Sequence, residues 1–328
     1  MSSAPQQAEL LPTVSVIVPT YRRAHRLEKT LRPLLADPAT TELVVVADGG
    51  DDGSGDVVGR LAEADNRVRL LTPPHGGPRS AVAVGLKHAT GEVVLLLDDD
   101  VVARPGLVTG HARHHQGARG LVVVGYMPCV PTQSAGGVPL LTRIYGKEYE
   151  AQCAAFERDP SLVLRQLWGG NLSLRRADCE AVGLTPWPYA HEDWDFGLRC
   201  LRQGLSGTFD RHLYAEHEHE RDAKTFLSNA RAFGAGRAYM HQVHGDMLGP
   251  LDVDKEFGHV PTVLRPLISV VAIPGRSHLV TAPVVRLAGL AGSLHMTVIE
   301  SAAYRLARRV EMRVGAKEVE LAAGAAGH

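Results

Sequence analysis

A run of five apolar residues that ends in three aspartates places the strongest constraint on this chain. The run, Val93–Leu97, is followed directly by Asp98, Asp99 and Asp100. A short apolar stretch of this kind predicts a strand buried on both faces, as in a parallel sheet. Side chains alternate along a strand, so we expect Asp98 and Asp100 on one side and Asp99 on the other. Ligands bind at the carboxyl ends of such strands, and a divalent cation shared with a phosphate would suit the acidic pair better than a solvated turn.

Apolar segments alternate with helical patterns through the first hundred residues. The other predicted strands are Val14–Val18, Leu43–Val46 and Val68–Leu71. The segments with apolar residues at helical spacing are 27–35, 57–64 and 79–88. This strand–helix rhythm predicts an α/β fold with a Rossmann-like, mostly parallel sheet and helices on both faces.

The second half of the chain is less regular. The expected elements are a strand at Leu121–Val124, a Pro- and Gly-rich loop at 128–139 and a helix at 140–165. Beyond residue 249, the apolar stretches 262–273 and 279–309 carry scattered Arg and His residues and indicate amphipathic helices. We expect these helices to pack on the sheet domain or on a second copy of the chain, with peripheral membrane contact as the alternative. Residues 1–12 and 321–328 are predicted to be disordered tails.

The composition excludes several classes of protein. Lys and Arg total 35 against 36 for Asp and Glu, so the chain lacks the basic character of a nucleic-acid-binding protein. The four cysteines have no paired spacing, which favours reduced thiols and a cytoplasmic protein. The sequence has no signal-peptide pattern and no run of about 18 apolar residues, so we expect a cytoplasmic location, with contact at the inner face of the membrane left open.

Five motifs, in the expected order, resemble those of family 2 glycosyltransferases. They are Val14–Tyr21, the acidic Gly-rich loop 48–55, Leu97–Asp100, Gly170–Arg176 and His191–Arg199. The resemblance covers roughly residues 14–240 and implies a GT-A fold. It implies a nucleotide-sugar-binding half at 13–125, an acceptor-binding half at 126–249 and a C-terminal helical extension at 250–320. Such enzymes are inverting: they move a sugar from a nucleoside diphosphate, most often UDP, to an acceptor hydroxyl or amine.

The resemblance assigns residues to the donor and to a metal ion. The donor-binding set is Pro19, Thr20, Tyr21, Asp48, Arg79, Asp98 and Asp99. Thr20 and Tyr21 would flank the base, and Asp48 would accept from its N–H. The expected ligands of Mn²⁺ or Mg²⁺ are Asp100, Asp98, His217 and His219. On an extended segment both histidines would face one side, although surface histidines without a ligand are the alternative.

The resemblance also assigns the acceptor side. Asp193 is the expected general base, with Glu192 as its nearest rival, because an acceptor hydroxyl must lose a proton as it attacks. The alternative is that both carboxylates merely cap a helix. Acceptor contacts are assigned to Gly170, Asn171 and Trp168. The acceptor itself, whether a small molecule, a glycan or a lipid-linked compound, is left open.

Two departures from the family pattern weaken the donor assignments. Ala47 stands where many members have the first of two aspartates, and Val82–Ala83 stand where many have Arg-Asn. Arg79, one turn earlier, is the expected substitute. His111 and His115 are spaced like a zinc pair, but we expect them on a solvated helix face because no third ligand is suggested.

Two other functions stay open at this point. A sugar-phosphate nucleotidyltransferase has a similar acidic site, but it would want a Gly-rich loop with a basic residue after the first strand. The sequence Pro19-Thr20-Tyr21 has no glycine there. The second alternative is a non-catalytic protein that binds nucleotide sugars, against which the intact Asp100 and Asp193 argue.

Overall fold

The computed structural model describes residues 10–50, 52–130, 138–219, 222–258 and 273–326, together with 266, 268 and 270. The chain divides into two compact units. We call the first, drawn from residues 10–130, 145–186 and 196–219, the sheet unit. The second, drawn from 138–144, 187–195 and 222–326, is the helical unit. The expected loop at 128–139 and helix at 262–273 lie largely outside the described residues.

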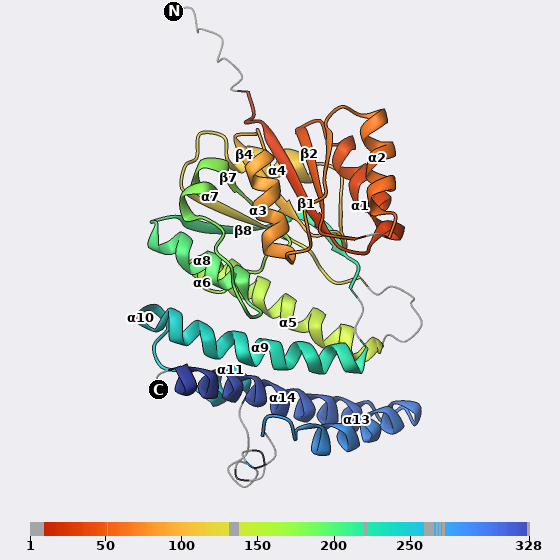
Figure 1. The fold of residues 1–328 in the computed structure, drawn as a ribbon, viewed down its shortest axis with the longest axis vertical. Helices are drawn as coiled ribbons and strands as arrows, with labels where there is room; N and C mark the ends of the chain where they lie inside the picture. Colours follow the sequence, from red (N-terminus) through yellow and green to blue (C-terminus); the bar gives the residue numbers. More distant parts are fainter. Residues whose placement is uncertain are drawn as a thin grey trace, which may run out of the picture. The chain divides into compact units, whose positions relative to one another are not determined.

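The sheet unit is built on an eight-stranded sheet with the order β3-β2-β1-β4-β7-β6-β8-β5 among the described residues (Figure 1). The strands are β1 (Val14–Thr20), β2 (Thr40–Ala47), β3 (Val68–Leu71), β4 (Val93–Leu97), β5 (Val101–Ala103), β6 (Leu121–Tyr126), β7 (Asn171–Arg175) and β8 (Ser206–His217). Strands β1 to β4 are parallel, as predicted. However, β7 runs antiparallel to β4 and β6, and β5 runs antiparallel to β8. The sheet is therefore mixed, a feature that the sequence did not reveal because doubly buried strands look alike in either orientation.

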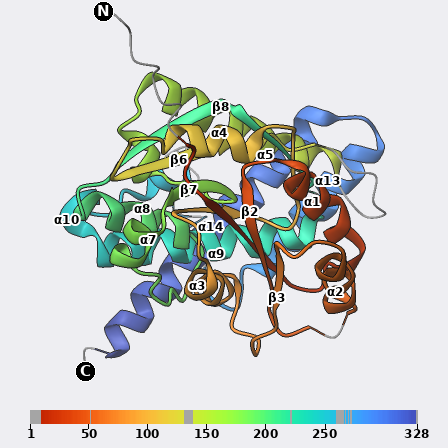
Figure 2. The same cartoon turned by 90° about the horizontal axis from the view of Figure 1, so that it is seen from above.

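Alternating side chains along the strands fill two separate cores. Val14, Val16 and Val18 of β1 belong to one core, whereas Ile17 belongs to the other. The first face is covered by α1 (Ala24–Ala36), α2 (Ser54–Ala64) and α4 (Leu107–His114). The second face is covered by α3 (Pro78–His88), α6 (Leu162–Arg165) and α7 (Arg176–Val182). Figure 2 shows α3 and α4 on opposite sides of the strands, which confirms the prediction of helices on both faces.

Two helices belong to both units. They are α5 (Pro139–Arg158) and α8 (Glu192–Arg202), each of which starts in the helical unit and ends in the sheet unit. The single helix predicted at 140–165 is in fact α5 followed by α6. Pro160 lies between the two, where its missing N–H and fixed ring interrupt the helical ladder.

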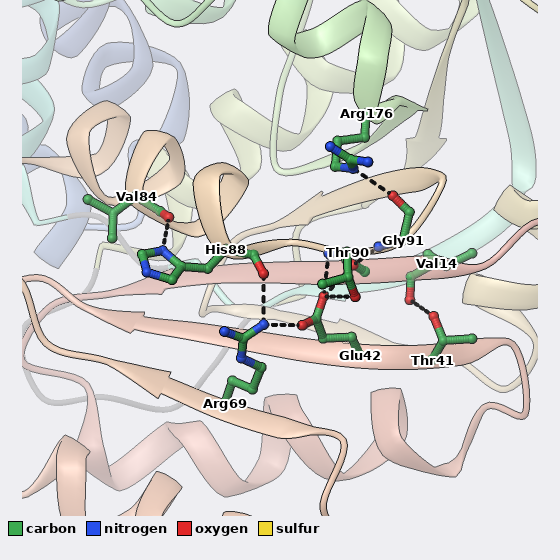
Figure 3. Close-up of polar contacts among 10 residues, drawn as sticks. Val14, Thr41, Glu42, Arg69, Val84, His88, Thr90, Gly91 and Arg176 are labelled. Carbon is green, nitrogen blue, oxygen red and sulfur yellow. Dashed lines mark hydrogen bonds and ion pairs between the residues drawn. The ribbon is translucent and has the colours of Figure 1, made fainter.

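The edge of the sheet where β1, β2 and β4 begin is held by one buried carboxylate. Glu42 of β2 accepts hydrogen bonds from the Ser15 hydroxyl of β1 (2.6 Å) and from the backbone N–H of Thr90 (2.9 Å). Arg69 of β3 donates to the second oxygen (2.7 Å) and to the carbonyl of His88 (Figure 3). Burial acts to raise the pKa of Glu42, but these donors outweigh it and hold the pKa below its usual range. The Glu42 side chain thus connects β1, β2 and β3 to the segment that precedes β4.

The helical unit is organised around two long helices. Its elements are α9 (Ala223–Val243), α10 (Gly245–Leu248), α11 (Val253–Phe257), α13 (His278–Ser293) and α14 (Thr297–Ala326). Helices α9 and α14 lie side by side (Figure 1). A Cβ atom on Gly234 of α9 would collide with the Met312 carbonyl of α14, and one on Gly315 of α14 would collide with the Arg231 carbonyl of α9. These two glycines allow the helix backbones to touch.

Two boundaries differ from those expected. The division at residue 249 does not separate the units, because α9 packs with the C-terminal helices in one core. Helix α14 continues to Ala326, through most of the segment expected to be a disordered tail. The Ala-rich composition of that segment explains the difference, since Ala has the strongest helix preference. None of the helices in the described residues has the length and apolar character needed to span a membrane.

Candidate functional site

The three aspartates after β4 form a turn rather than a continuation of the strand. The backbone N–H of Val101 donates to the Asp98 carbonyl (3.1 Å), so the strict alternation that we expected ends at Leu97. Asp99 points to β1, where its carboxylate accepts a hydrogen bond from the Thr20 hydroxyl (2.7 Å). Asp98 is exposed. The turn therefore sends the aspartate side chains to different surroundings.

Asp100 meets two histidines from the other end of the sheet unit. Strand β5 pairs antiparallel with β8 so that Val101 lies opposite His217, and the Glu218 N–H donates to the Asp100 carbonyl (2.8 Å). This register brings one ligand atom each of Asp100, His217 and His219 within 4.8 Å of one another. Asp98, the fourth expected ligand, is not in this cluster as far as the described residues go. We call the three residues the Asp–His cluster.

The electrostatics of the Asp–His cluster suit a cation. Burial acts to raise the pKa of Asp100, but the nearby His217, Arg23 and His219 outweigh it and hold the pKa below its usual range. Burial raises the pKa of the neighbouring Asp99, and repulsion from Asp100 adds to that effect. His217 Nδ1 is buried with no hydrogen-bond partner among the described residues. Carboxylate oxygen and imidazole nitrogen are both ligands of Mn²⁺, so the donor set fits a divalent metal.

One face of α1 supplies positive charge beside the Asp–His cluster. Arg23 Nη2 lies 3.7 Å from Asp100 Oδ2, and Arg26 donates to the Glu218 carbonyl (3.0 Å). Lys29 forms an ion pair with the Glu218 carboxylate. Residues three apart share a helix face, so a cation at every third position was the signal in the sequence that we missed.

Aromatic rings line the other side of the histidines. The Tyr145 ring centre lies 5.0 Å from that of His219 and 6.0 Å from that of His217. Trp168, an expected acceptor contact, packs edge-on against Tyr145 (5.6 Å) and Tyr149 (5.1 Å). Tyr145 was not predicted as a site residue, because nothing in α5 marks it until the tertiary fold brings it to β8.

The expected base-binding residues separate into exposed and buried groups. Tyr21 is 41% exposed and stacks on His75, with ring centres 4.6 Å apart. Thr20 is buried and holds Asp99, while the neighbouring Pro19 is half-buried. Asp48 is also buried, and its carboxylate accepts from the N–H groups of Gly76 and Gly77 (2.8 Å each). Asp48 thus holds the turn that carries His75, and the exposed stack of Tyr21 on His75 is the surface that a base can reach.

Arg79 lies in the first turn of α3 and is half-buried. It is close enough to Cys179 of α7 to lower the pKa of that thiol, against the larger effect of burial, which raises the pKa to about 12. The expected role as a substitute for the missing Arg-Asn pair stays a prediction.

Asn171 and two histidines of α4 form a buried hydrogen-bond chain. Asn171 Nδ2 donates to the Leu213 carbonyl (3.0 Å), so its Oδ1 accepts from His111 Nε2 (2.9 Å). His111 Nδ1 then accepts from the Ser173 hydroxyl (2.7 Å), which in turn accepts from His115 Nε2 (2.8 Å). Burial lowers the pKa of His111 to about 3 and that of His115 to about 4, so both rings are neutral.

This hydrogen-bond chain corrects one expectation and adds a structural role for Asn171. His111 and His115 are fully buried rather than on a solvated face, because the helix period places both against β7. Asn171 is also fully buried, and its side chain is hydrogen-bonded to Leu213 and His111, so it supports the sheet; the expected contact with an acceptor stays a prediction. Gly170 has φ 99°, and a Cβ there would come within 2.6 Å of the Asp98 carboxylate, so the glycine serves the acidic turn.

The expected general base lies at the start of α8, in the helical unit. Asp193 and Glu192 are both half-buried in the first turn, and Asp193 Oδ1 accepts from the Trp194 N–H (3.0 Å). Asp195, two residues on, is buried and pairs with His244 Nε2 at the end of α9 (2.9 Å). His191 precedes the turn with φ 70°. The contact between Asp195 and His244 thus anchors this first turn, while Asp193 remains partly exposed to solvent.

Comparisons with known proteins agree with this geometry. Residues 15–153 match the family model described as Glycosyl transferase family 2. An uncharacterized glycosyltransferase of Haemophilus influenzae is 24% identical over 204 residues, which cover 59% of this chain and 73% of that protein. The validoxylamine A glucosyltransferase of Streptomyces hygroscopicus subsp. jinggangensis is 28% identical over 259 residues, covering 68% of this chain and 60% of that protein. Several other relatives are matched over only 27% to 30% of their own length.

A solved structure shows the same fold. The mannosyltransferase PcManGT from Pyrobaculum calidifontis, in complex with GDP-Man and Mn²⁺, aligns with a TM-score of 0.55 at 19% identity, covering 92% of this chain and 87% of that one. The resemblance seen in the motifs and the fold expected from it are therefore both confirmed. Residues 15–153 thus resemble glycosyltransferase family 2, and the chain has a GT-A fold.

Proposed function

We propose that this protein is an inverting, metal-dependent glycosyltransferase that moves a sugar from a nucleoside diphosphate, UDP first among the candidates, to an acceptor hydroxyl or amine. The observation that carries the proposal is the Asp–His cluster at the carboxyl end of β4, with the cationic face of α1 beside it. Ligands of open α/β sheets bind at this end of the strands.

Asp100, His217 and His219 would hold Mn²⁺ or Mg²⁺. When bound, the cation would stabilise the negative charge that develops on the departing nucleoside diphosphate. Arg23 adds a fixed positive charge at the same place. The exposed face of Tyr21, backed by His75, would stack on the base of the donor. Metal dependence is also supported by PcManGT, whose structure contains Mn²⁺ with a nucleotide sugar.

Asp193 would act as the general base that takes the proton from the acceptor hydroxyl. Its place in the first turn of α8 leaves the carboxylate partly accessible. A single displacement with a base opposite the leaving group inverts the anomeric centre. Residues 13–125 would then serve the donor and residues 126–249 the acceptor, whose chemistry stays undefined, with Trp168 and Tyr145 offering aromatic faces for a sugar ring.

The experiment is to incubate the protein with UDP-, GDP- and dTDP-sugars and to measure release of the nucleoside diphosphate with Mn²⁺, with Mg²⁺ and with EDTA. We expect release from one donor class only, and only with a metal. Pyrophosphate release from a nucleoside triphosphate and a sugar phosphate would instead identify a nucleotidyltransferase. Donor binding by calorimetry without any turnover would identify a binding protein.

Asp193→Asn tests the base. We expect turnover to fall by about 10²–10⁴-fold, the usual contribution of general base catalysis, while the affinity for the donor is unchanged. Glu192→Gln is the matched control in the same helical turn and should keep most of the activity. If the two variants exchange these results, Glu192 is the base.

A further inference from the structure

Helix α13 carries its largest apolar side chains on the face that is exposed to solvent. The exposed leucines, 65%, 51%, 59% and 60% accessible, are Leu279, Leu287, Leu290 and Leu294. Their spacing places them along one side of the helix. The buried residues of the same helix are small: Thr281, Ala288 and Ala291. The packing of α13 in the helical unit therefore uses these small side chains together with the partly buried Val284 and Val285, and its leucines are left outside.

The apolar surface continues past the end of the helix. Met296, Val298 and Ile299, at the turn into α14, are 45%, 81% and 40% exposed. We call these residues and the four leucines the leucine face. Single exposed apolar side chains are common on proteins, but a cluster of this kind on one element marks an interaction site.

The charge within residues 257–299, which carry the leucine face, has one sign, and the first carboxylate beyond them, Glu300, lies next to Gly292 at the end of α13. The sequence has no Asp or Glu between Glu256 and Glu300. Among the described residues of this segment, the exposed basic and histidine side chains are Arg276, His278, Arg286 and His295. Since the whole chain is nearly neutral, this is a local separation of charge. A partner must therefore combine an apolar interior with negative charge at its surface.

We propose that the leucine face binds an anionic lipid surface, with α13 lying flat in the interface. Leucines buried at the boundary of the acyl chains and arginines at the level of the head groups are the arrangement that such helices adopt. A second copy of the chain is a poorer partner, because it would place two sets of cations against each other. This contact is separate from the transfer reaction and needs neither donor nor acceptor.

The test is flotation of the full chain with phosphatidylcholine vesicles, with and without phosphatidylglycerol, in the absence of nucleotide sugar. We expect binding to vesicles that contain phosphatidylglycerol and weaker binding as salt is added. The double variant Leu287→Gln/Leu290→Gln should lose most of the binding. Leu321→Gln is the matched control, since Leu321 is 65% exposed on α14 but lies outside the leucine face. It should bind like the unmodified protein.

Removal of charge gives an independent measurement. Arg276→Gln and Arg286→Gln should each weaken binding to the anionic vesicles by about five-fold, whereas Arg113→Gln on α4 should not. Equal binding by the double leucine variant and the unmodified protein would overturn the proposal, as would no binding at all. A dimer in solution that the double leucine variant converts to monomer would assign the leucine face to a second copy instead.

Discussion

The two edges of the sheet at which its parallel strands begin and end differ in how a buried carboxylate is bonded. At the edge where the strands begin, Glu42 receives donors from Ser15, Thr90 and Arg69, and both of its oxygens are engaged within the protein. At the edge where they end, Asp100 is almost as buried, but its neighbours are His217 at 3.4 Å and Arg23 at 3.7 Å, longer than ordinary hydrogen bonds. At the first edge the hydrogen bonds of the carboxylate are all made within the protein, whereas at the second edge the carboxylate and its neighbours offer ligand atoms that an ion can use.

This difference shows how one sheet serves both stability and function. A carboxylate whose hydrogen bonds are all satisfied stabilises the fold, because breaking the set would leave buried donors unpaired. Burial raises the pKa of Asp99, and repulsion from Asp100 adds to that effect; this repulsion costs stability and would be relieved by a bound cation. We therefore expect substitutions at the two edges to separate loss of activity from loss of stability.

The largest effect is expected from Asp100→Ala. Loss of this proposed metal ligand should lower the transfer rate by about 10³-fold or more and abolish metal-dependent binding of UDP in calorimetry. The melting temperature should change little, since the substitution removes the repulsion with Asp99 together with the attraction to His217 and Arg23. Metal-dependent binding that survives the substitution would place the ion elsewhere.

The reverse result is expected for Glu42→Ala. It leaves the Ser15 hydroxyl and the Thr90 N–H unpaired, so the free energy of unfolding should fall by about 2–3 kcal/mol, measured by urea denaturation. At a temperature where the variant is folded, metal-dependent UDP binding should be unchanged. Glu42→Gln, which keeps one acceptor and the shape, should recover part of the stability. A variant that loses UDP binding while folded would show that the two edges are not independent.

The free energy of unfolding should also fall as the pH is lowered, because of two buried histidines that lie between the two edges. His111 and His115 have folded-state pKa values of about 3 and about 4, below the unfolded value of about 6.5. The unfolded chain therefore binds more protons, and the stabilisation present above pH 6.5 is lost as the pH falls toward 4. Each histidine contributes up to about 1.4 kcal/mol per pH unit.

The measurement is urea denaturation at several pH values between 7.5 and 5. In His115→Gln, which keeps a donor for Ser173, we expect a shallower dependence of the unfolding free energy on pH. An unchanged slope would assign the titration to other groups, such as His191 in the helical unit, whose pKa burial lowers to about 3.

The smallest effect is expected on the exposed part of the site. Lys29→Gln removes the positively charged partner of Glu218. Lys29 is 61% exposed, and ion pairs at such surface positions contribute about 1 kcal/mol or less. We expect KM for the donor to rise by a few-fold at low salt, with the difference lost at high salt. The matched control is Arg32→Gln on the same helix, since Arg32 forms an ion pair with Glu28 and not with a residue of the site.

Much of the fold could be predicted because its signals are local. Nearly continuous apolar runs at Val14–Val18 and Val93–Leu97 identified the strands, and helical spacing identified α1 to α3. The orientation of β7 could not be predicted, since an apolar strand is compatible with either direction. His111 and His115 were misplaced because polar side chains at helical spacing look solvated until Ser173 and Asn171 lie beneath them.

By itself, the sequence determined the acidic end of β4, the alternation of strands and helices, and the order of the motifs, because each depends on neighbouring residues. Only the tertiary structure decided that Asp100 meets His217 and His219, that α1 adds cations beside them, and that Asn171 is buried in a hydrogen-bond chain. These contacts join residues from 42 to 192 positions apart through the pairing of β5 with β8 and the packing of helices. No local pattern records which distant partner a side chain will meet.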